Sequence, residues 1–304
     1  MSFRSLLPIK KDEEIFVSYI DCTEPYHHRQ RELSRQYFFK CKCTKCQRGI
    51  NTTEDRFLKP LDTLPPRWDK DITWPPGAMN GFAYTDLNDK SNYVSDSAAG
   101  ASLEATQWLA RKQLGTCKRY PQPIPNEKME EAVETIQLGL SVCLQTHIWP
   151  EHRQPLAAIR HFIFTTFLSF KQGLRIYFLI NPVLYPQPFH PIRVVHNWTL
   201  LNLLLSYLDP NAKLAEEAEL RDAGVDFGTA IYGLLLEVHD NVQRSHGKES
   251  AFAKEVARKM EEVTTDMSGG DDGERLRGVR GRMEGQWRIL RKLAEGEELG
   301  SVLG

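Results

Sequence analysis

The chain has 304 residues, of which 41% are hydrophobic and 26% are charged. This is enough apolar sequence to build the core of one or two domains, and it excludes an intrinsically disordered protein. The 39 basic and 40 acidic residues nearly balance, so the chain as a whole has no field that would attract nucleic acid or an anionic membrane. Direct nucleic-acid binding is therefore not expected.

The N-terminal sequence and the apolar runs favour a cytoplasmic and/or nuclear protein. The start, "MSFRSLLPIKKDEEIF", has no signal-peptide core followed by small cleavage-site residues. The most apolar run, "WTLLNLLLSYL", is too short to cross a bilayer. In a reducing compartment, closely spaced cysteines indicate a metal site rather than disulfide bonds.

Residues 1–47 combine an expected strand, a short helix and a cysteine-rich knuckle. The run "IFVSYI" is β-branched and aromatic, has the length of a strand, and follows a polar turn. The next stretch, "EPYHHRQRELSRQYFF", has a proline near its start and helical spacing of its aromatic and basic residues. We expect this helix to lead directly into the knuckle.

Residues 48–127 are expected to form a loop-rich insertion or linker, because the stretches "TLPPRW" and "TWPPGAMNGF" are rich in turn residues. Residues 128–304 have helical periodicity instead. Apolar residues recur at i, i+3, i+4 and i+7 from Met129 to Leu144, and the same period continues through 155–180, 191–208, 212–223, 226–245 and 248–266.

The predicted fold class is mainly α. Short breakers between the periodic segments favour antiparallel helical neighbours. We expect an array of about seven to nine helices that resembles tetratricopeptide (TPR-like) repeats, with a small β element and the knuckle at its N-terminus.

The knuckle offers a metal site. The spacing of Cys41, Cys43 and Cys46 lets three thiolates converge on one cation, and tetrahedral sulfur coordination favours zinc. The alternative is three unliganded cysteines on a loop. Three ligands are one short of a closed structural site. The fourth ligand stays open among Cys22, His27, His28, a water molecule and a residue of another chain. Adjacent histidines in a polar stretch are usually solvated, which weakens the case for the histidines.

These stretches carry a family resemblance. "IKKDEEIFVSYID" and "RELSRQYFFKCKCTKC" resemble the end of a SET domain and its post-SET zinc knuckle in the SET-and-MYND (SMYD-type) protein lysine methyltransferases, especially fungal ones. "HRQPLAAIRHFIF" and "NPVLYPQPFHPIRVVHNWTLLNLL" are similar to the helical C-terminal domain of that family. The resemblance implies methyl transfer from S-adenosylmethionine to a lysine of a protein substrate, and it makes the β element a remnant of a SET domain.

The resemblance also implies roles for single residues. Tyr19 matches the active-site tyrosine, whose hydroxyl lies near the transferred methyl group. Phe39 matches the aromatic that stacks on the adenine of the cofactor, and Tyr37 matches a wall of the lysine-access channel. The three cysteines match post-SET zinc ligands. Taken alone, the aromatics are typical packing residues, and only their order relative to the knuckle distinguishes them.

Other motifs of the family are not found in the sequence. The MYND finger, the cofactor-binding glycine motif, the Asn-His motif and the source of the fourth zinc ligand all lie upstream of the matching segments in the family. The pair His196-Asn197 reverses the Asn-His order and lies in an apolar helix, where an interior role is expected. Because catalysis needs the complete constellation, we expect a truncated chain that is inactive by itself.

The expected domains are the end of a SET domain with its knuckle (1–47), the insertion (48–127) and the helical domain (128–304). The helical domain is expected to bind a protein or peptide, without a membrane. The alternative to a methyltransferase relative is a non-catalytic interaction module, in which the helical array binds its partner and the knuckle is only a cap.

Overall fold

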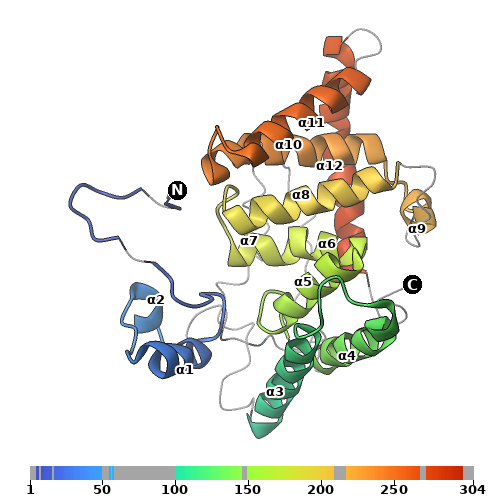
Figure 1. Ribbon diagram of the computed structural model, residues 1–304. Coiled ribbons are helices and arrows are strands. Elements are labelled where there is room, and N and C mark those ends of the chain that lie inside the picture. The colour runs from blue at the N-terminus through green and yellow to red at the C-terminus, as the bar shows by residue number, and fades with distance from the viewer. Residues whose placement is uncertain are drawn as a thin grey trace. The chain divides into compact units, whose positions relative to one another are not determined.

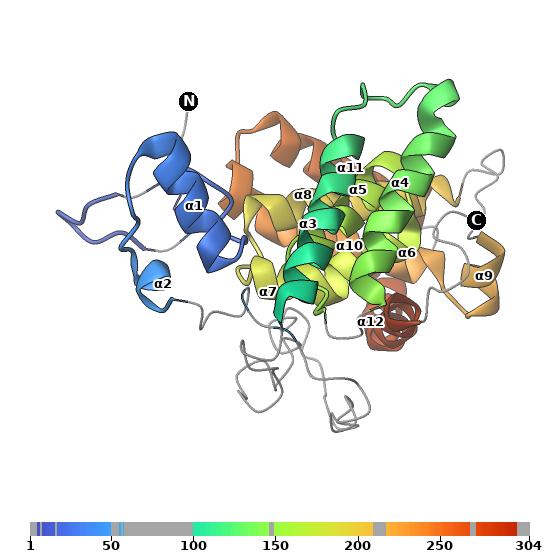
Figure 2. The same ribbon diagram turned by 90° about the horizontal axis from the view of Figure 1, so that it is seen from below.

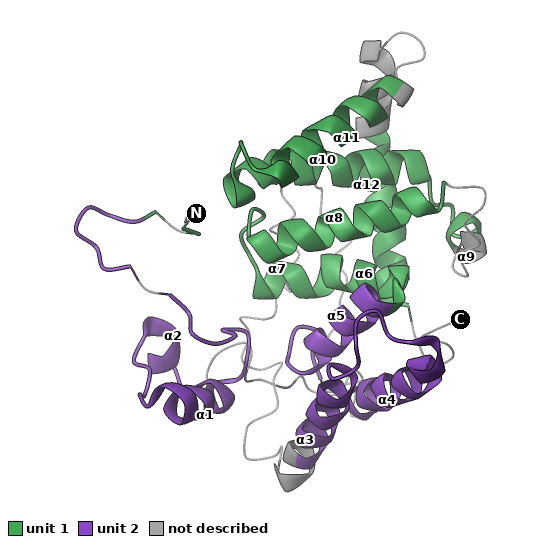
Figure 3. Ribbon diagram, in the orientation of Figure 1, with its two compact units in different colours: residues 1–8, 73–82, 167–304 green, residues 9–72, 83–166 purple. Residues whose placement is uncertain are grey.

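The computed structural model describes residues 5, 6, 8–15, 17–49, 55, 57, 100–145, 149–208, 217–267 and 272–296. The chain divides into two compact units (Figure 3). Unit 1 comprises residues 1–8, 73–82 and 167–304, and unit 2 comprises residues 9–72 and 83–166. Regular structure in the described ranges is helical (Figure 1), which confirms the mainly α fold class.

Unit 2 contains the knuckle and the first helices, which are α1 (Tyr26–Tyr37), α2 (Thr44–Gln47), α3 (Gly100–Cys117), α4 (Asn126–Leu144) and α5 (Leu156–Phe167). Helices α3 and α4 lie side by side, as Figure 1 and Figure 2 both show. A Cβ atom on Gly139 of α4 would lie 3.2 Å from the Cβ of Gln113 on α3. Glycine therefore permits the close approach of these two helices.

Helix α3 lies in the segment that we expected to be loop-rich. Ala110, Leu114 and Cys117 are buried along it at helical spacing, so the periodic signal was present in the sequence. The turn residues that determined the expectation precede residue 100, and "TLPPRW" and "TWPPGAMNGF" lie outside the described residues. The loop-rich interpretation is wrong for 100–117.

The expected β element is not found among the described residues of the first twenty. Residues 10–13 form a turn, in which the Glu13 backbone N–H donates to the Lys10 carbonyl at 3.2 Å. Beyond it the described residues up to Ile20 form neither helix nor strand, and Ile15 and Val17 are 70% and 66% exposed. A strand requires a ladder partner for its backbone groups, and the described part of the chain provides none here.

Unit 1 is built around a long central helix, α10 (Phe227–His246). It packs against α8 (Pro191–Ser206), α11 (Ala251–Met267) and α12 (Asp272–Glu295), as Figure 1 shows. The remaining elements are α6 (Phe170–Arg175), the π-helical segment η7 (Ile176–Ile180), α7 (Asn181–Leu184) and α9 (Glu217–Asp222).

The described ranges contain twelve α-helices and one π-helical segment, more than the seven to nine expected. One reason is that the periodic segment 155–180 breaks at Leu168, where φ is 54°. In the part of the chain that the structure describes, no helix is both long and apolar enough to span a membrane. The TPR-like repeat and the three domain boundaries stay predictions.

Candidate metal centre and aromatic cluster

Three aromatic residues meet at the end of α1. The ring centroid of Tyr19 lies 5.1 Å from that of Tyr37 and 6.0 Å from that of Phe39. The Tyr37 hydroxyl donates to the Tyr19 carbonyl at 3.2 Å. Between them, Phe38 adopts a left-handed conformation (φ 60°, ψ 28°) that ends the helix. Phe38 is 88% exposed, whereas Phe39 is 39% exposed. The three aromatic residues named from the sequence thus lie together, with Tyr37 and Phe39 on either side of the left-handed residue that ends the helix.

The three knuckle cysteines also meet. The Sγ atoms of Cys41, Cys43 and Cys46 all lie within 4.8 Å of one another. Burial, together with hydrogen bonds to the Cys43 and Cys41 thiols, raises the pKa of the Cys46 thiol to about 11. Burial acts in the same direction on Cys43, but hydrogen bonds from the Cys46 backbone and from the neighbouring thiols outweigh it and lower the pKa of Cys43. These residues could hold a metal ion, and the sulfur donor set fits zinc.

No fourth ligand joins this cluster among the described residues. Cys22 is exposed, and its carbonyl accepts from Lys45 Nζ at 2.7 Å. His28 lies between Glu24 and Glu32, with its Nδ1 atom 3.8 and 3.7 Å from their carboxylates. Burial lowers the pKa of His28, and the positive charge of Arg111 lowers it further. In the structure His28 is a partner of carboxylates rather than a member of the cysteine cluster.

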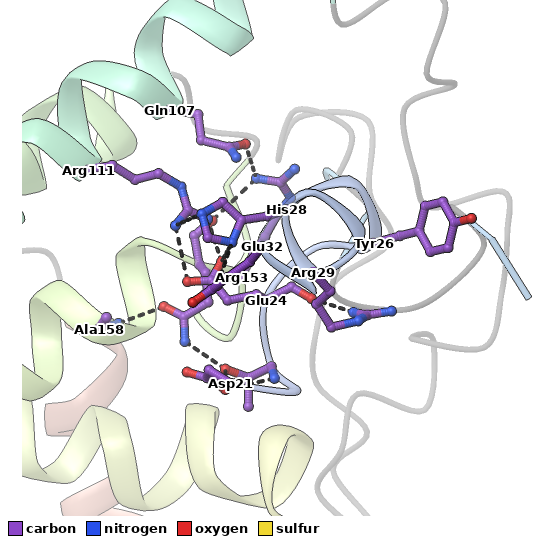
Figure 4. A network of polar contacts seen from close by, with 12 residues as sticks. Asp21, Glu24, Tyr26, His28, Arg29, Glu32, Gln107, Arg111, Arg153 and Ala158 are labelled. Atoms are coloured by element: carbon purple, nitrogen blue, oxygen red, sulfur yellow. Dashed lines mark hydrogen bonds and ion pairs between the residues drawn. The ribbon is translucent and has the colours of Figure 1, made fainter. Parts of the chain in front are cut away.

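A polar network holds the segment after Tyr19 onto the helices of unit 2 (Figure 4). Arg111 on α3 donates to the Glu24 carboxylate at 3.0 Å. Gln154 donates to the Thr23 hydroxyl at 2.9 Å and accepts from the Ala158 N–H of α5 at 3.1 Å. The Asp21 carboxylate in turn accepts from the Thr23 N–H at 2.8 Å. The network thereby fixes the chain between the tyrosine and α1.

Arg153 extends the network, and sequence reasoning missed it. Its guanidinium lies 3.7 Å from the ring centroid of Phe57 and 5.1 Å from that of Trp149, and it donates to Gln107 at 3.1 Å. Burial lowers the pKa of Arg153 to about 10. The signal in the sequence was the polar "HRQ" stretch directly before an apolar helix. Polar residues that are buried beside such a helix need hydrogen-bonding or charged partners, so the stretch indicated a buried polar network.

Comparisons with known proteins find relatives by sequence. No family model matches the chain. Over 46 residues, 15% of this chain and 10% of the relative, it is 48% identical to the SET domain and MYND-type zinc finger protein 6 of Schizosaccharomyces pombe. Over 58 residues, 19% of this chain and 11% of the relative, it is 41% identical to the histone-lysine N-methyltransferase Smyd1 of Mus musculus.

A longer match extends along most of the chain. It is 24% identical to the histone-lysine N-methyltransferase ASHR1 of Arabidopsis thaliana over 271 residues, which are 87% of this chain and 50% of that protein. The chain is related to the SET-and-MYND proteins. It spans half the length or less of these SET-and-MYND relatives.

Proposed function

We propose that this chain supplies the tyrosine, the aromatic wall and the zinc knuckle of an S-adenosylmethionine-dependent protein-lysine methyltransferase site, and that it does not catalyse by itself. The observation that carries the proposal is the meeting of Tyr19, Tyr37 and Phe39 directly before the three-thiol cluster. Two relatives that carry the name histone-lysine N-methyltransferase support it. Methyl transfer in the family also uses the glycine and Asn-His motifs, which are not found in these 304 residues.

Each aromatic has a defined task in this proposal. Bound S-adenosylmethionine supplies the methyl group. The Tyr19 hydroxyl orients the incoming lysine amine, because alignment of the nucleophile with the methyl group supplies much of the rate. Tyr37 forms an apolar wall that favours the neutral, nucleophilic form of the amine. Phe39 stacks on the adenine ring.

The cysteines hold zinc in this proposal, and the metal has a structural task. Cys41 lies two residues after Phe39, so a cation on the three thiolates fixes the chain that carries the aromatic wall. A closed site needs a fourth ligand, which is a water molecule or a residue of another polypeptide.

The remaining assignments follow from the same proposal. The substrate is a protein lysine, and the helical domain at 128–304 binds the protein or peptide. The segments 1–47 and 48–127 are the end of a SET domain with its knuckle and an insertion. The protein acts in the cytoplasm, the nucleus or both.

Binding of S-adenosylmethionine to the full chain, measured by titration calorimetry, tests the proposal. We expect the wild type to bind and Phe39→Ala to abolish binding, since the adenine loses its stacking partner. Phe38→Ala is the matched control, because this neighbouring ring is 88% exposed, and it should bind like the wild type. No binding by the wild type at millimolar ligand would overturn the proposal and favour a non-catalytic interaction module. Lysine methylation by the chain alone would contradict the proposal that the chain does not catalyse by itself.

A further inference from the structure

Cys43 and Cys46 lie on one turn of chain at the start of α2. Cys43 directly precedes the helix, and the Gln47 backbone N–H donates to the Cys43 carbonyl at 2.9 Å. This bond closes a helical turn that contains both cysteines. Cα atoms three residues apart in such a turn are about 5 Å from each other, which lies within the range of about 4.4–6.8 Å that a disulfide bond requires. The backbone therefore permits a bond between the two sulfur atoms.

The two thiols lie close together but differ in exposure. Their Sγ atoms are within 4.8 Å of each other. Cys43 is exposed, whereas Cys46 is 7% exposed. An oxidant in solution therefore reaches Cys43, and Cys46 is placed to react with Cys43 afterwards. An accessible thiol beside a second, resolving thiol is the usual arrangement of cysteines that respond to oxidants.

The third thiol of the cluster is less suited to this bond. Cys41 lies outside the helical turn and is only partly exposed. The Gln30 side chain donates to the Cys41 carbonyl at 3.0 Å, and its oxygen accepts from the Cys41 N–H at 3.1 Å. These two hydrogen bonds attach the Cys41 backbone to α1. The geometry therefore favours the pair of Cys43 and Cys46 over a pair that includes Cys41.

We infer that hydrogen peroxide converts Cys43 and Cys46 of the metal-free knuckle into a reversible disulfide bond, with Cys43 as the thiol that reacts first and Cys46 as the resolving thiol. The Cys43 sulfur attacks one peroxide oxygen, so that an S–O bond forms, the O–O bond breaks and hydroxide leaves. The Cys46 sulfur then attacks the Cys43 sulfur, so that the S–S bond forms, the S–O bond breaks and a second hydroxide leaves. The two thiol protons convert both hydroxides to water. Two thiols are thereby oxidised to one disulfide, and one peroxide is reduced to two water molecules.

Oxidation and metal binding exclude each other at this cluster. The disulfide bond uses two of the three converging thiols and leaves one of them for a metal ion, and zinc binds the free thiolate form. This consequence rests on the proposed zinc site. The disulfide bond itself depends only on the placement and the exposure of the thiols.

Peptide mapping of the full wild-type chain tests the inference without any substitution. Trypsin cleaves after Lys42 and Lys45 and therefore places Cys41, Cys43 and Cys46 in three separate peptides. The chain is treated with a chelator and then with hydrogen peroxide. We expect the peptides of Cys43 and Cys46 to be joined by a disulfide bond that dithiothreitol reverses. A disulfide bond that includes Cys41, or no disulfide bond at all, would overturn the inference.

Two variants test the order of the steps. Cys46→Ser removes the resolving thiol, so peroxide should leave Cys43 as a sulfenic acid, which dimedone traps. A dimedone adduct on Cys41 in place of Cys43 would overturn the assignment of Cys43. The matched control is Cys22→Ser, at an exposed thiol outside the cluster, and this variant should form the same disulfide bond as the wild type. If Cys46→Ser does not fold, the peptide map of the wild type still decides.

The zinc content of the same samples separates this inference from the proposed zinc site. We expect the reduced wild type to bind zinc, the oxidised form to lose zinc binding, and dithiothreitol to restore it. If the reduced chain binds zinc but forms no disulfide bond between Cys43 and Cys46 after chelation, the inference is overturned and the zinc site stands. If it binds no zinc but forms this bond, the zinc site is refuted and the disulfide bond stands.

Discussion

Arg193, on α8 of unit 1, is only 1% exposed, and its Nη2 atom lies 3.8 Å from the Glu237 carboxylate on α10. The same carboxylate accepts from the Asn197 side chain at 3.1 Å and from the Tyr177 hydroxyl. Burial raises the pKa of Glu237, and the charge of Arg193 and these two donors act against it. Asn197 is thereby an interior hydrogen-bonding residue, as its place in an apolar helix predicted.

Replacing Glu237 should strongly destabilise unit 1. Glu237→Gln keeps the size of the side chain but leaves Arg193 buried without its countercharge. Breaking one side of a buried ion pair costs about 3 to 5 kcal/mol, and chemical denaturation measures the change in the free energy of unfolding. The control is Glu284→Gln, at a side chain that is 47% exposed and 4.0 Å from Arg288, for which we expect about 1 kcal/mol or less. Equal effects of the two variants would contradict the account.

At the scale of elements, α10 and α12 approach closely because α10 carries a glycine at the crossing. A Cβ atom on Gly233 would lie 2.6 Å from Cη2 of Trp287 and 3.0 Å from Cε of Met283. Trp287 is 6% exposed, and its indole N–H donates to the Tyr177 hydroxyl at 3.1 Å. The buried ring is restrained by this hydrogen bond, which opposes its movement away from an added methyl group.

Gly233→Ala should therefore destabilise the helix pair although alanine is the better helix former. Overpacking of a filled core costs about 1 to 3 kcal/mol, which exceeds the gain of about 1 kcal/mol from helix propensity. Gly285→Ala, on α12, is the control, because nothing lies within 4 Å of its added Cβ. We expect a raised melting temperature for Gly285→Ala and a lowered one for Gly233→Ala, and a gain for both would show that Trp287 can move.

The helices were predictable from the sequence where periodicity and burial coincide. Helix α10 spans Phe227–His246, against an expected 226–245, because its apolar positions repeat without interruption. The expected helix at 155–180 was less accurate. It is interrupted at Leu168, where φ is 54°, and its last residues form the π-helical segment η7. Periodicity reports which face of a helix is buried, and it carries no information on a single residue that adopts a left-handed conformation.

At the scale of the whole molecule, the candidate site could be located from the sequence because its residues lie close to one another along the chain. The structure groups Tyr19, Tyr37 and Phe39, as it groups the three cysteines. The network that supports them was not predictable. Gln154 bonds Thr23 across 131 residues of chain, and Arg111 bonds Glu24 across 87. Such contacts depend on tertiary packing, and single glutamines and arginines leave no repeating pattern in a sequence.

The cysteine cluster and the polar network that supports the neighbouring chain consist of different residues, and this leads to a prediction on metal removal. A chelator should release the chain around the thiols, whereas the contacts of Glu24 and Thr23 with α3 and Gln154 do not involve the cluster. We expect faster amide hydrogen exchange in residues 39–49 and at the end of α1, with unchanged protection in α10, whose core contacts lie in unit 1. Local opening of this kind is what hydrogen exchange resolves.

Two cysteine variants complete that experiment. Cys43→Ser removes one of the three converging thiols and should reproduce the effect of the chelator without any chelator present. Cys22→Ser removes an exposed thiol outside the cluster, so its exchange should match the wild type with metal and respond to the chelator in the same way. If the chelator leaves exchange in 39–49 unchanged in the metal-loaded wild type, the ion does not hold the knuckle, and the cysteines require another role.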